Sequence, residues 1–220
     1  MNARNRIPNP TIKRLSLYLR ELELWQEQAR STISSRQLAE KLGLTDAQVR
    51  KDLAYFGQMG HPGVGYRVQQ LHERLKQIIG TDRSWNAAIV GAGNIGRALM
   101  SYGRFAREGF DIVAVFDSNE KVVGQQIEGH SVRPLTDLGQ LVRERNIQIG
   151  IISTPPSAAQ EVADMLIDAG VSGILNFAPR RLDVGKKVFV NSVDFTVSLE
   201  QLAFQISLEQ KDENEEAGDS

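Results

Sequence analysis

Three glycines at fixed spacing, Gly91, Gly93 and Gly96, constrain this chain more than any other feature. They follow a short apolar run and precede a stretch with helical periodicity. A glycine turn between a strand and a helix exposes backbone N–H groups at the helix N-terminus, where the helix dipole favours a pyrophosphate. The sequence therefore predicts a βαβ unit whose turn, together with Asn94 and Ile95, binds a dinucleotide.

An acidic residue stands where such a site needs one. Asp117 ends the next apolar run, twenty-one residues after Gly96. A carboxylate at about this distance accepts a hydrogen bond from a ribose 2′-hydroxyl and repels a 2′-phosphate. The order of strand, helix, second strand and acid favours dinucleotide binding over a purely structural turn, and NAD(H) over NADP(H). We expect the helix over 94–107, with Ile95, Ala98, Leu99 and Tyr102 on one side.

The alternation of strands and helices continues after Asp117. Apolar runs at 148–153, 173–177 and 187–190 read as strands, and 136–145 and 156–169 as helices. This order predicts an α/β fold with a parallel sheet and right-handed crossovers. Thr154 and Pro155 fall just past the carboxyl end of a strand, where open α/β sheets bind ligands, although a proline there also starts helices.

No catalytic group accompanies the predicted nucleotide site. A dehydrogenase needs a positioned acid or base and a substrate domain or lid, but the chain after Asp117 has one histidine, His130, in a polar segment that we read as a loop. We therefore predict no enzyme, and a nucleotide that is bound without being transformed. Two alternatives remain: an NAD-dependent oxidoreductase, or a sheet domain that binds coenzyme A or another adenine nucleotide beside a protein-docking module.

The composition excludes several classes of protein. The chain has no cysteine, so disulfides and thiolate metal sites are excluded, and its three histidines show no metal-ligand spacing. No apolar run approaches the length of a membrane span, and the start of the chain lacks the apolar core of a signal peptide. We expect a soluble cytoplasmic protein without a metal. The acidic segment 210–220 is predicted to be a disordered tail.

The charge is distributed unevenly along the chain. Residues 1–80 contain thirteen Lys and Arg against seven Asp and Glu, a balance of +6, whereas the remainder has a balance of −7. This asymmetry is typical of a protein whose first part meets a polyanion, although a solvated basic face would look the same.

Two short helices are expected within this basic part, after a longer one over 11–28. Ser34 to Gln37 is a capping box that opens the first, Gly43 ends it, and Thr45 to Gln48 is a second capping box. Helix, short turn and helix is the helix-turn-helix plan. The second helix would present polar side chains to a major groove, namely Gln48, Arg50, Lys51 and Tyr55.

The glycine-rich segment 57–67 follows these helices and predicts a β-hairpin wing. The capped helices, the wing and the basic balance together favour DNA binding over a structural or dimerising helical domain. Further along, Phe195, Leu199, Leu202 and Ile206 make an apolar stripe on a helix that needs a partner surface, either its own sheet or a second copy.

The chain resembles the Rex family of NADH-responsive bacterial repressors from about Ile7 to Leu208. The segments that carry the resemblance are 10–15 (PTIKRL), 49–57 (VRKDLAYFG), 63–66 (GVGY), the glycine turn, 173–179 (GILNFAP) and 193–195 (VDF). One departure is the pair Pro155-Pro156 in place of a single proline.

The resemblance implies four parts: a winged-helix DNA-binding domain (1–80), a Rossmann-like NAD(H)-binding domain (85–192), a C-terminal helix swapped between protomers (193–209) and the tail. It implies a homodimer that binds operator DNA when NADH is scarce and leaves it when NADH, a regulatory ligand, binds. The expected nucleotide contacts then include Asn176, Phe177 and Phe195, the last near the nicotinamide. The expected DNA contacts include Ser35, His61 and Tyr66. Arg14, Tyr102 and Asp194 are expected to form a polar switch.

Overall fold

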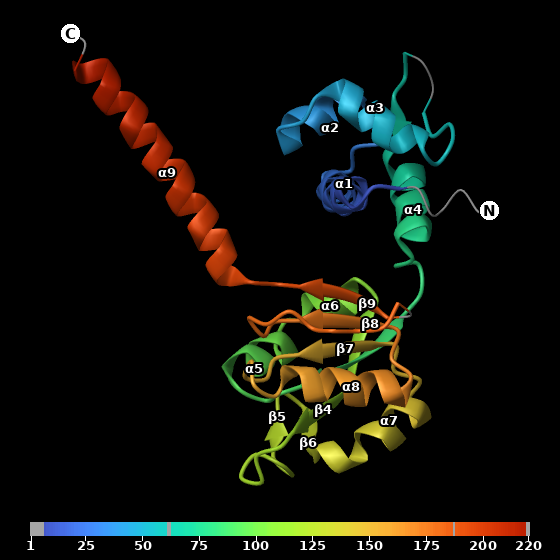
Figure 1. The fold of residues 1–220 in the computed structure, drawn as a ribbon. Coiled ribbons are helices and arrows are strands. Elements are labelled where there is room, and N and C mark those ends of the chain that lie inside the picture. The colour runs from blue at the N-terminus through green and yellow to red at the C-terminus, as the bar shows by residue number, and fades with distance from the viewer. Residues whose placement is uncertain (1–6, 61–62, 187, 219–220) are drawn as a thin grey trace. The chain divides into compact units, whose positions relative to one another are not determined.

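The chain divides into two compact units, residues 1–84 and 85–220 (Figure 1). This computed structural model describes residues 7–60, 63–186 and 188–218, with side chains described as far as Gln210. Within these residues, no helix combines the length and apolar character needed to cross a bilayer.

The first unit is a small helical domain with a two-stranded wing. Its core packs the apolar faces of the helices around the buried side chains of Tyr18, Leu22, Leu38 and Leu71. Trp25, one of the protein's two tryptophans, also lies in this core. The elements are α1 (Asn9–Glu27), β1 (Thr32–Ile33), α2 (Ser35–Leu42), α3 (Asp46–Ala54), β2 (Tyr66–Arg67) and α4 (Val68–Ile79).

The helix-turn-helix is confirmed, but the second capping box is only half formed. Ser34 and Gln37 make both reciprocal hydrogen bonds at the start of α2, and Gly43 ends that helix with φ of 64°. At α3, the Thr45 hydroxyl accepts a hydrogen bond from the Gln48 backbone. The Gln48 side chain does not return the bond and instead reaches Asp52, because a buried carboxylate is the stronger acceptor.

The wing is not the local hairpin that the glycine-rich segment predicted. β2 pairs antiparallel with β1, which lies before the helix-turn-helix, so Ile33 faces Tyr66. Gly65 permits this approach, because a Cβ on it would lie 2.6 Å from the Ile33 carbonyl oxygen.

The second unit is built on a seven-stranded sheet with the order β5-β6-β4-β3-β7-β8-β9, all parallel except β5. The chain first extends the sheet from β3 through β4 to β6 and then returns to the other side of β3 with β7. The order therefore reverses between β3 and β7, and the crevice at such a switch point is where ligands bind. The strands are β3 (Trp85–Val90), β4 (Phe110–Asp117), β5 (Gln126–Ile127), β6 (His130–Pro134), β7 (Ile149–Ile152), β8 (Gly173–Asn176) and β9 (Phe189–Ser192).

Helices connect these strands and cover the sheet (Figure 1). They are α5 (Asn94–Met100), α6 (Arg104–Arg107), α7 (Leu138–Glu144), preceded by a 3₁₀ turn at Leu135–Asp137, and α8 (Ala159–Ala169). The side chains of Phe116, Ile152, Leu138 and Leu166 fill the core between the sheet and α7 and α8. The second tryptophan, Trp85, begins β3.

Two expectations for this unit were wrong. The helix predicted over 94–107 is interrupted after Met100, and its buried residues are Gly96 and Met100, whereas Ile95 and Tyr102 are exposed. Gly96 packs directly against the glycine turn that begins at Gly91, and this contact determines which face of α5 is buried. His130 begins strand β6 rather than lying in a loop. Its strand was missed because only Val132 among 131–133 is buried.

The last helix, α9 (Phe195–Gly218), extends beyond residue 209 and includes most of the segment that we expected to be a disordered tail. Every described side chain from Phe195 to Gln210 is exposed. Its large apolar side chains are therefore uncovered in a single chain, among them Leu199 and Phe204 at 66% and 65% exposure.

Candidate functional site

The glycine turn after β3 is tight and closely packed. Gly91 has φ of 105°, and a Cβ on it would lie 2.7 Å from the Ser153 carbonyl oxygen at the end of β7. A Cβ on Gly96 would lie 1.9 Å from the Gly91 carbonyl oxygen. The first glycine therefore permits the turn, and the third lets α5 pack directly against it.

The second glycine has the opposite surroundings. A Cβ on Gly93 would meet nothing within 4 Å, and this exposed residue is the N-cap of α5 without a side chain that caps the helix. The first N–H groups of α5 thus face space that a ligand's phosphates can enter. Asn94 and Ile95, both exposed, begin the helix beside this space.

Asp117 lies beside the turn, at the carboxyl end of β4. Its Oδ2 accepts a hydrogen bond from the Ala92 backbone N–H at 2.7 Å, and its Oδ1 accepts one from the Asn119 backbone at 2.8 Å. Ala92 is also bonded through its carbonyl oxygen, which accepts a hydrogen bond from Arg97 Nε at 3.1 Å. The backbone of Ala92 is therefore held from both sides, and a partly exposed carboxylate stands next to the turn.

The end of β7 forms the other wall of this switch point. Ser153 Oγ donates to the Gly91 carbonyl oxygen at 2.8 Å, which joins the two strand ends. Next to it, the buried Oγ1 of Thr154 has no hydrogen-bond partner among the described residues. An unpaired buried hydroxyl costs about 1–3 kcal/mol, so a ligand that bonds to it would recover that cost. Pro155 follows and is exposed.

The loop after β8 is organised by Asn176, which is fully buried. Its Nδ2 donates to the carbonyl oxygens of Ala178 and Arg180, and its Oδ1 accepts from the Ala178 backbone. The side chain thus shapes the loop rather than pointing out of it. This brings Phe177 near the start of α9, where its ring centroid lies 6.2 Å from that of Phe195.

In the first unit, three of the four polar side chains expected on the second helix of the helix-turn-helix are exposed, two of them in α3 and Tyr55 directly after it. Arg50, Lys51 and Tyr55 are exposed, and Arg50 Nη1 is held by Asp46 Oδ2 at 2.5 Å, with Ser35 Oγ at 3.4 Å. Arg50, Ser35 and Tyr66 line one hollow of about 620 Å³ between α3 and the wing. Burial raises the pKa of Tyr66. His61 lies outside the described residues.

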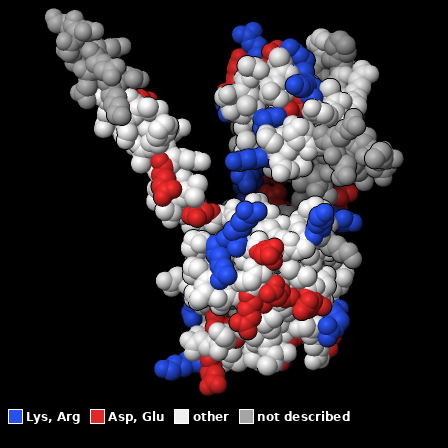
Figure 2. All heavy atoms as spheres, in the orientation of Figure 1, with Lys and Arg blue, Asp and Glu red and all other residues white. Residues whose placement is uncertain are grey.

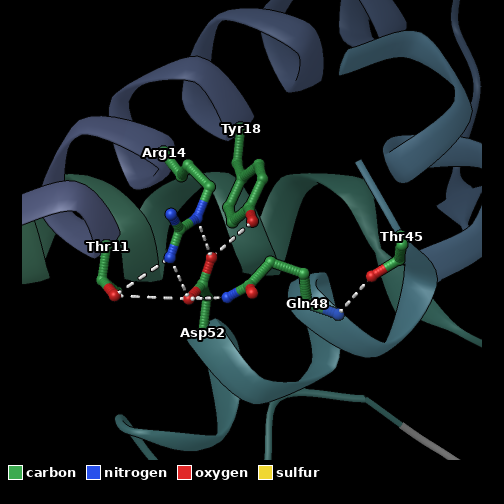
Figure 3. A network of polar contacts seen from close by, with 6 residues as sticks. All are labelled: Thr11, Arg14, Tyr18, Thr45, Gln48 and Asp52. Atoms are coloured by element: carbon green, nitrogen blue, oxygen red, sulfur yellow. Dashed lines mark hydrogen bonds and ion pairs between the residues drawn. The ribbon is translucent and has the colours of Figure 1, made fainter. Parts of the chain in front are cut away.

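Gln48, the fourth, points inward to a buried carboxylate that the sequence reading missed (Figure 3). Asp52 on α3 has no solvent exposure and accepts five hydrogen bonds. Four come from α1: Arg14 Nε at 2.6 Å, Arg14 Nη2 at 2.8 Å, Tyr18 Oη at 2.7 Å and Thr11 Oγ1 at 3.3 Å. The fifth comes from Gln48 Nε2 at 2.9 Å. We call these five residues the Asp52 cluster.

The pKa values in the Asp52 cluster follow from this geometry. Burial raises the pKa of Asp52, but the hydrogen bonds from Arg14, Tyr18 and Gln48 outweigh it and hold the pKa below its ordinary value. The pKa of Arg14 is raised by its hydrogen bond to Asp52, and that of Tyr18 by burial and by the same carboxylate. The cluster is thus an ionised pair surrounded by neutral donors.

The three expected switch residues make local contacts. Arg14 bonds to Asp52 and Thr11 within the first unit. In the second unit, Tyr102 is half exposed and packs edge-on against Phe105, with ring centroids 5.0 Å apart. Asp194 Oδ1 accepts hydrogen bonds from the backbone of Thr196 and Val197 at the start of α9. Their coupling stays a prediction.

The charges also differ between the two units. Figure 2 shows Lys and Arg side chains spread over the first unit, whereas acidic side chains gather on the visible face of the second. Among the described residues, no group of three or more His, Asp or Glu side chains is arranged to hold a metal ion.

Comparison with known proteins adds to this geometry. Residues 82–180 match a family model described as a CoA binding domain, and residues 6–54 match one described as the N-terminus of a putative DNA-binding protein. The chain is 50% identical to the redox-sensing transcriptional repressor Rex of Carboxydothermus hydrogenoformans, over 91% of this chain and 97% of that protein. It is 46% identical to Rex of Syntrophomonas wolfei, over 92% of this chain and 97% of that protein.

Solved structures give the same result for the fold. RSP, a Rex-family repressor, has been solved in complex with NAD⁺ and operator DNA. The chain matches that structure with a TM-score of 0.89 at 35% identity, over 94% of this chain and 96% of RSP. The complex of RSP with NADH matches with a TM-score of 0.86 at 34% identity, over 95% and 98%. The arrangement of a DNA-binding unit followed by a Rossmann-like α/β unit is therefore confirmed.

Proposed function

This chain belongs to the Rex family of redox-sensing transcriptional repressors, and we propose that it binds operator DNA as a homodimer and leaves it when NADH binds. Its relatives are named as repressors, so the protein is a regulator and not an enzyme. One observation carries the proposal: a glycine turn suited to NAD(H) and an exposed helix suited to reading DNA occur in one chain that aligns almost end to end with RSP. We call this helix, α3, the reading helix.

The second unit would hold NAD(H) at the β3–β7 switch point. The open side of Gly93 and the first N–H groups of α5, at Asn94 and Ile95, would receive the pyrophosphate. Asp117 would accept from the adenosine ribose, and the unpaired hydroxyl of Thr154 would bond to the ligand. Pro155, Phe177 and Phe195 would be the apolar groups at the nicotinamide end, and the Phe177 and Phe195 rings already lie together, whereas Asn176 would act by shaping its loop.

The response to redox state follows from charge. The nicotinamide ring of NAD⁺ carries a positive charge that NADH lacks, and apolar surroundings such as Phe195 and Pro155 disfavour a desolvated cation. A ligand displaces DNA only when it binds the DNA-incompetent arrangement more tightly. Changing the ratio of DNA-incompetent to DNA-competent dimers from 1:99 to 99:1 takes a difference in binding free energy of about 5.5 kcal/mol. The two NADH molecules bound to a dimer would share it.

The first unit would contact the operator through α3 and the wing. Arg50 and Lys51 are exposed cations on the reading helix, with Tyr55 beside them. Ser35, at the start of α2, and Tyr66, in the wing, lie around the same hollow. Gln48 would contribute through Asp52, since its amide is already committed there.

The uncovered apolar face of α9 supports the homodimer. Residues 193–209 would cross to the partner, where they cover apolar surface that a single chain leaves exposed. Binding to DNA half-sites also favours two-fold symmetry. Arg14, Tyr102 and Asp194 would then couple nucleotide binding to the winged helix. We further propose that the protein acts in the cytoplasm, where operator DNA and NADH are both present.

The test is fluorescence anisotropy on a labelled palindromic duplex that the full-length protein has selected from a randomised pool. We expect specific binding that NADH reverses and that NAD⁺ leaves largely intact. Coenzyme A serves as a competitor, because the 82–180 segment matches a CoA binding domain. Displacement of DNA by coenzyme A and not by NADH would contradict the proposed ligand. Turnover of NADH with a small substrate would contradict the regulatory role.

A second arm tests the reading helix. Arg50→Ala should weaken operator binding more than tenfold while leaving NADH affinity unchanged, because Arg50 lies in the first unit only. Operator affinity should also fall steeply as salt increases, since phosphate contacts release counterions. Unchanged operator binding in this variant would contradict the assignment of α3.

A further inference from the structure

Asp52 is a charged residue of the reading helix that cannot reach DNA. It has no solvent exposure, and both of its carboxylate oxygens are occupied by donors of the same unit. The exposed cations Arg50 and Lys51 precede it directly in α3. A carboxylate buried directly after the DNA-reading side chains therefore needs a role other than contact.

The bonds of the Asp52 cluster cross between two helices. Four of the five hydrogen bonds come from α1 and only the Gln48 bond is internal to α3. Arg14 meets Asp52 with two adjacent donors, a pairing that fixes orientation as well as distance. Since an unpaired buried carboxylate is costly, any rotation of α3 against α1 that breaks these bonds is opposed.

α3 packs closely against α2, and the Asp52 clamp fixes its direction relative to α1. α3 has nine residues, and its buried apolar side chains are Val49 and Leu53. Apolar packing of this kind is non-directional, whereas the paired guanidinium and carboxylate define one angle. The angle between α1 and the helix that carries Arg50 and Lys51 is therefore fixed by Asp52.

We propose that Asp52 is a positioning residue for operator recognition: its clamp to Arg14, Tyr18 and Thr11 on α1 sets the angle at which α3 presents Arg50 and Lys51 to the base edges. The proposal rests on the proposed function, because it assumes that α3 reads the operator. It makes Asp52 necessary for specific binding although its carboxylate makes no contact with DNA.

Electrostatics alone predicts the opposite effect. Replacing an acid by a neutral residue near a polyanion raises affinity, for any DNA sequence. The positioning role predicts that Asp52→Asn weakens binding to the operator and leaves binding to unrelated DNA the same or tighter. The ratio of the two affinities separates these effects, since partial unfolding would lower both in proportion.

The experiment measures the affinity of the full-length protein for its selected palindromic duplex and for a scrambled duplex of equal length. We expect Asp52→Asn to lower the operator-to-scrambled ratio more than tenfold. Glu40→Gln is the matched control, because it removes the same charge from an exposed position of the adjacent helix α2. Its ratio should equal that of the wild type.

A milder variant keeps the proposal testable if Asp52→Asn fails to fold, as judged by thermal unfolding. Tyr18→Phe keeps the buried ring and removes one of the bonds to Asp52, so the ratio should fall about threefold. A wild-type ratio in folded Asp52→Asn or, where that variant is unfolded, in Tyr18→Phe overturns the proposal. A ratio lowered equally in Glu40→Gln also overturns it. If the wild type itself discriminates no duplex, the proposed function fails instead.

Discussion

The glycine turn and the Asp52 cluster are two polar sites built in opposite ways. The turn has almost no side chains: Gly91 and Gly96 remove them where backbones approach, and Gly93 leaves space for a ligand. The cluster is made of side chains, which satisfy one another around a buried charge and leave no space. A site made of backbone and space should be damaged by adding atoms, whereas one made of paired side chains should be damaged by removing them.

The largest effect is expected from adding one carbon to the turn. In Gly96→Ala, the new Cβ would lie 1.9 Å from the Gly91 carbonyl oxygen, so α5 or the turn must move. We expect the second unit to lose about 3 kcal/mol or more of unfolding free energy and NADH binding to be lost. Calorimetry of unfolding and NADH titration measure the two. Gly103→Ala is the control, since its Cβ meets nothing within 4 Å, and equal behaviour of the two variants would contradict the packing role.

The next effect, that of Gly93→Ala, distinguishes a glycine needed for packing from one that leaves room for the ligand. Gly93→Ala should leave the unfolding free energy unchanged, because φ is −73° and no atom lies within 4 Å of the new Cβ. NADH affinity should nevertheless fall at least tenfold, because the methyl group stands where phosphates approach α5. The same calorimetric and titration measurements apply. Normal NADH affinity in this variant would place the pyrophosphate elsewhere.

Asp117 is the side chain expected to contribute to the nucleotide site, and its removal should have a moderate effect. Asp117→Asn removes the charge that accepts from the Ala92 backbone and from the expected ribose. We expect affinities for NADH and NAD⁺ to fall about tenfold each, and NADPH to be discriminated against less strongly. Competition titration with the three nucleotides measures this. Unchanged affinities would show that the ribose lies away from β4.

The smallest effect concerns the cluster. Tyr18→Phe should lower the free energy of unfolding by about 1 kcal/mol at neutral pH, because one hydrogen bond to Asp52 is lost and the other four remain. The pKa of Tyr18 is raised above its ordinary value of 10.0, so the folded state holds this proton more tightly than the unfolded state. The contribution of Tyr18 is therefore complete below pH 10 and decreases above it. Urea unfolding at neutral pH and above pH 10 should show a gap between wild type and variant that narrows, and a constant gap would contradict the raised pKa.

The same contrast explains what the sequence could predict. The turn was predictable because its glycines lie within six residues, and Asp117 follows at a separation that βαβ geometry fixes. The Asp52 cluster was not, because Asp52 bonds to side chains 34 to 41 residues earlier, and no local pattern indicates which distant donors a buried acid meets. The strand pairing of the wing was predicted wrongly for the same reason, because the strand that pairs with β2 is β1, which precedes two helices in the sequence.

Local patterns also gave two wrong expectations, one for the Gln48 side chain and one for the buried face of 94–107. Gln48 has the right spacing for both a capping box and DNA contact, but the nearby carboxylate takes its amide. The apolar residues of 94–107 suggested one helix face, whereas the contact of Gly96 with the turn selects another. In both cases a short-range contact decided between conformations that the local sequence allows: Gln48 bonds to Asp52 within α3, and Gly96 packs on the turn that begins at Gly91.

The placement of the two tryptophans has a spectroscopic consequence. Trp25 is buried in the helical core of the first unit, and Trp85 begins the central strand of the second. Each unit thus carries its own intrinsic fluorophore. Replacing Trp25 by Phe would leave emission from the nucleotide-binding unit alone, and replacing Trp85 would leave emission from the reading unit. NADH binding in the second unit and the response of the first unit can then be timed separately by stopped-flow fluorescence without an added dye.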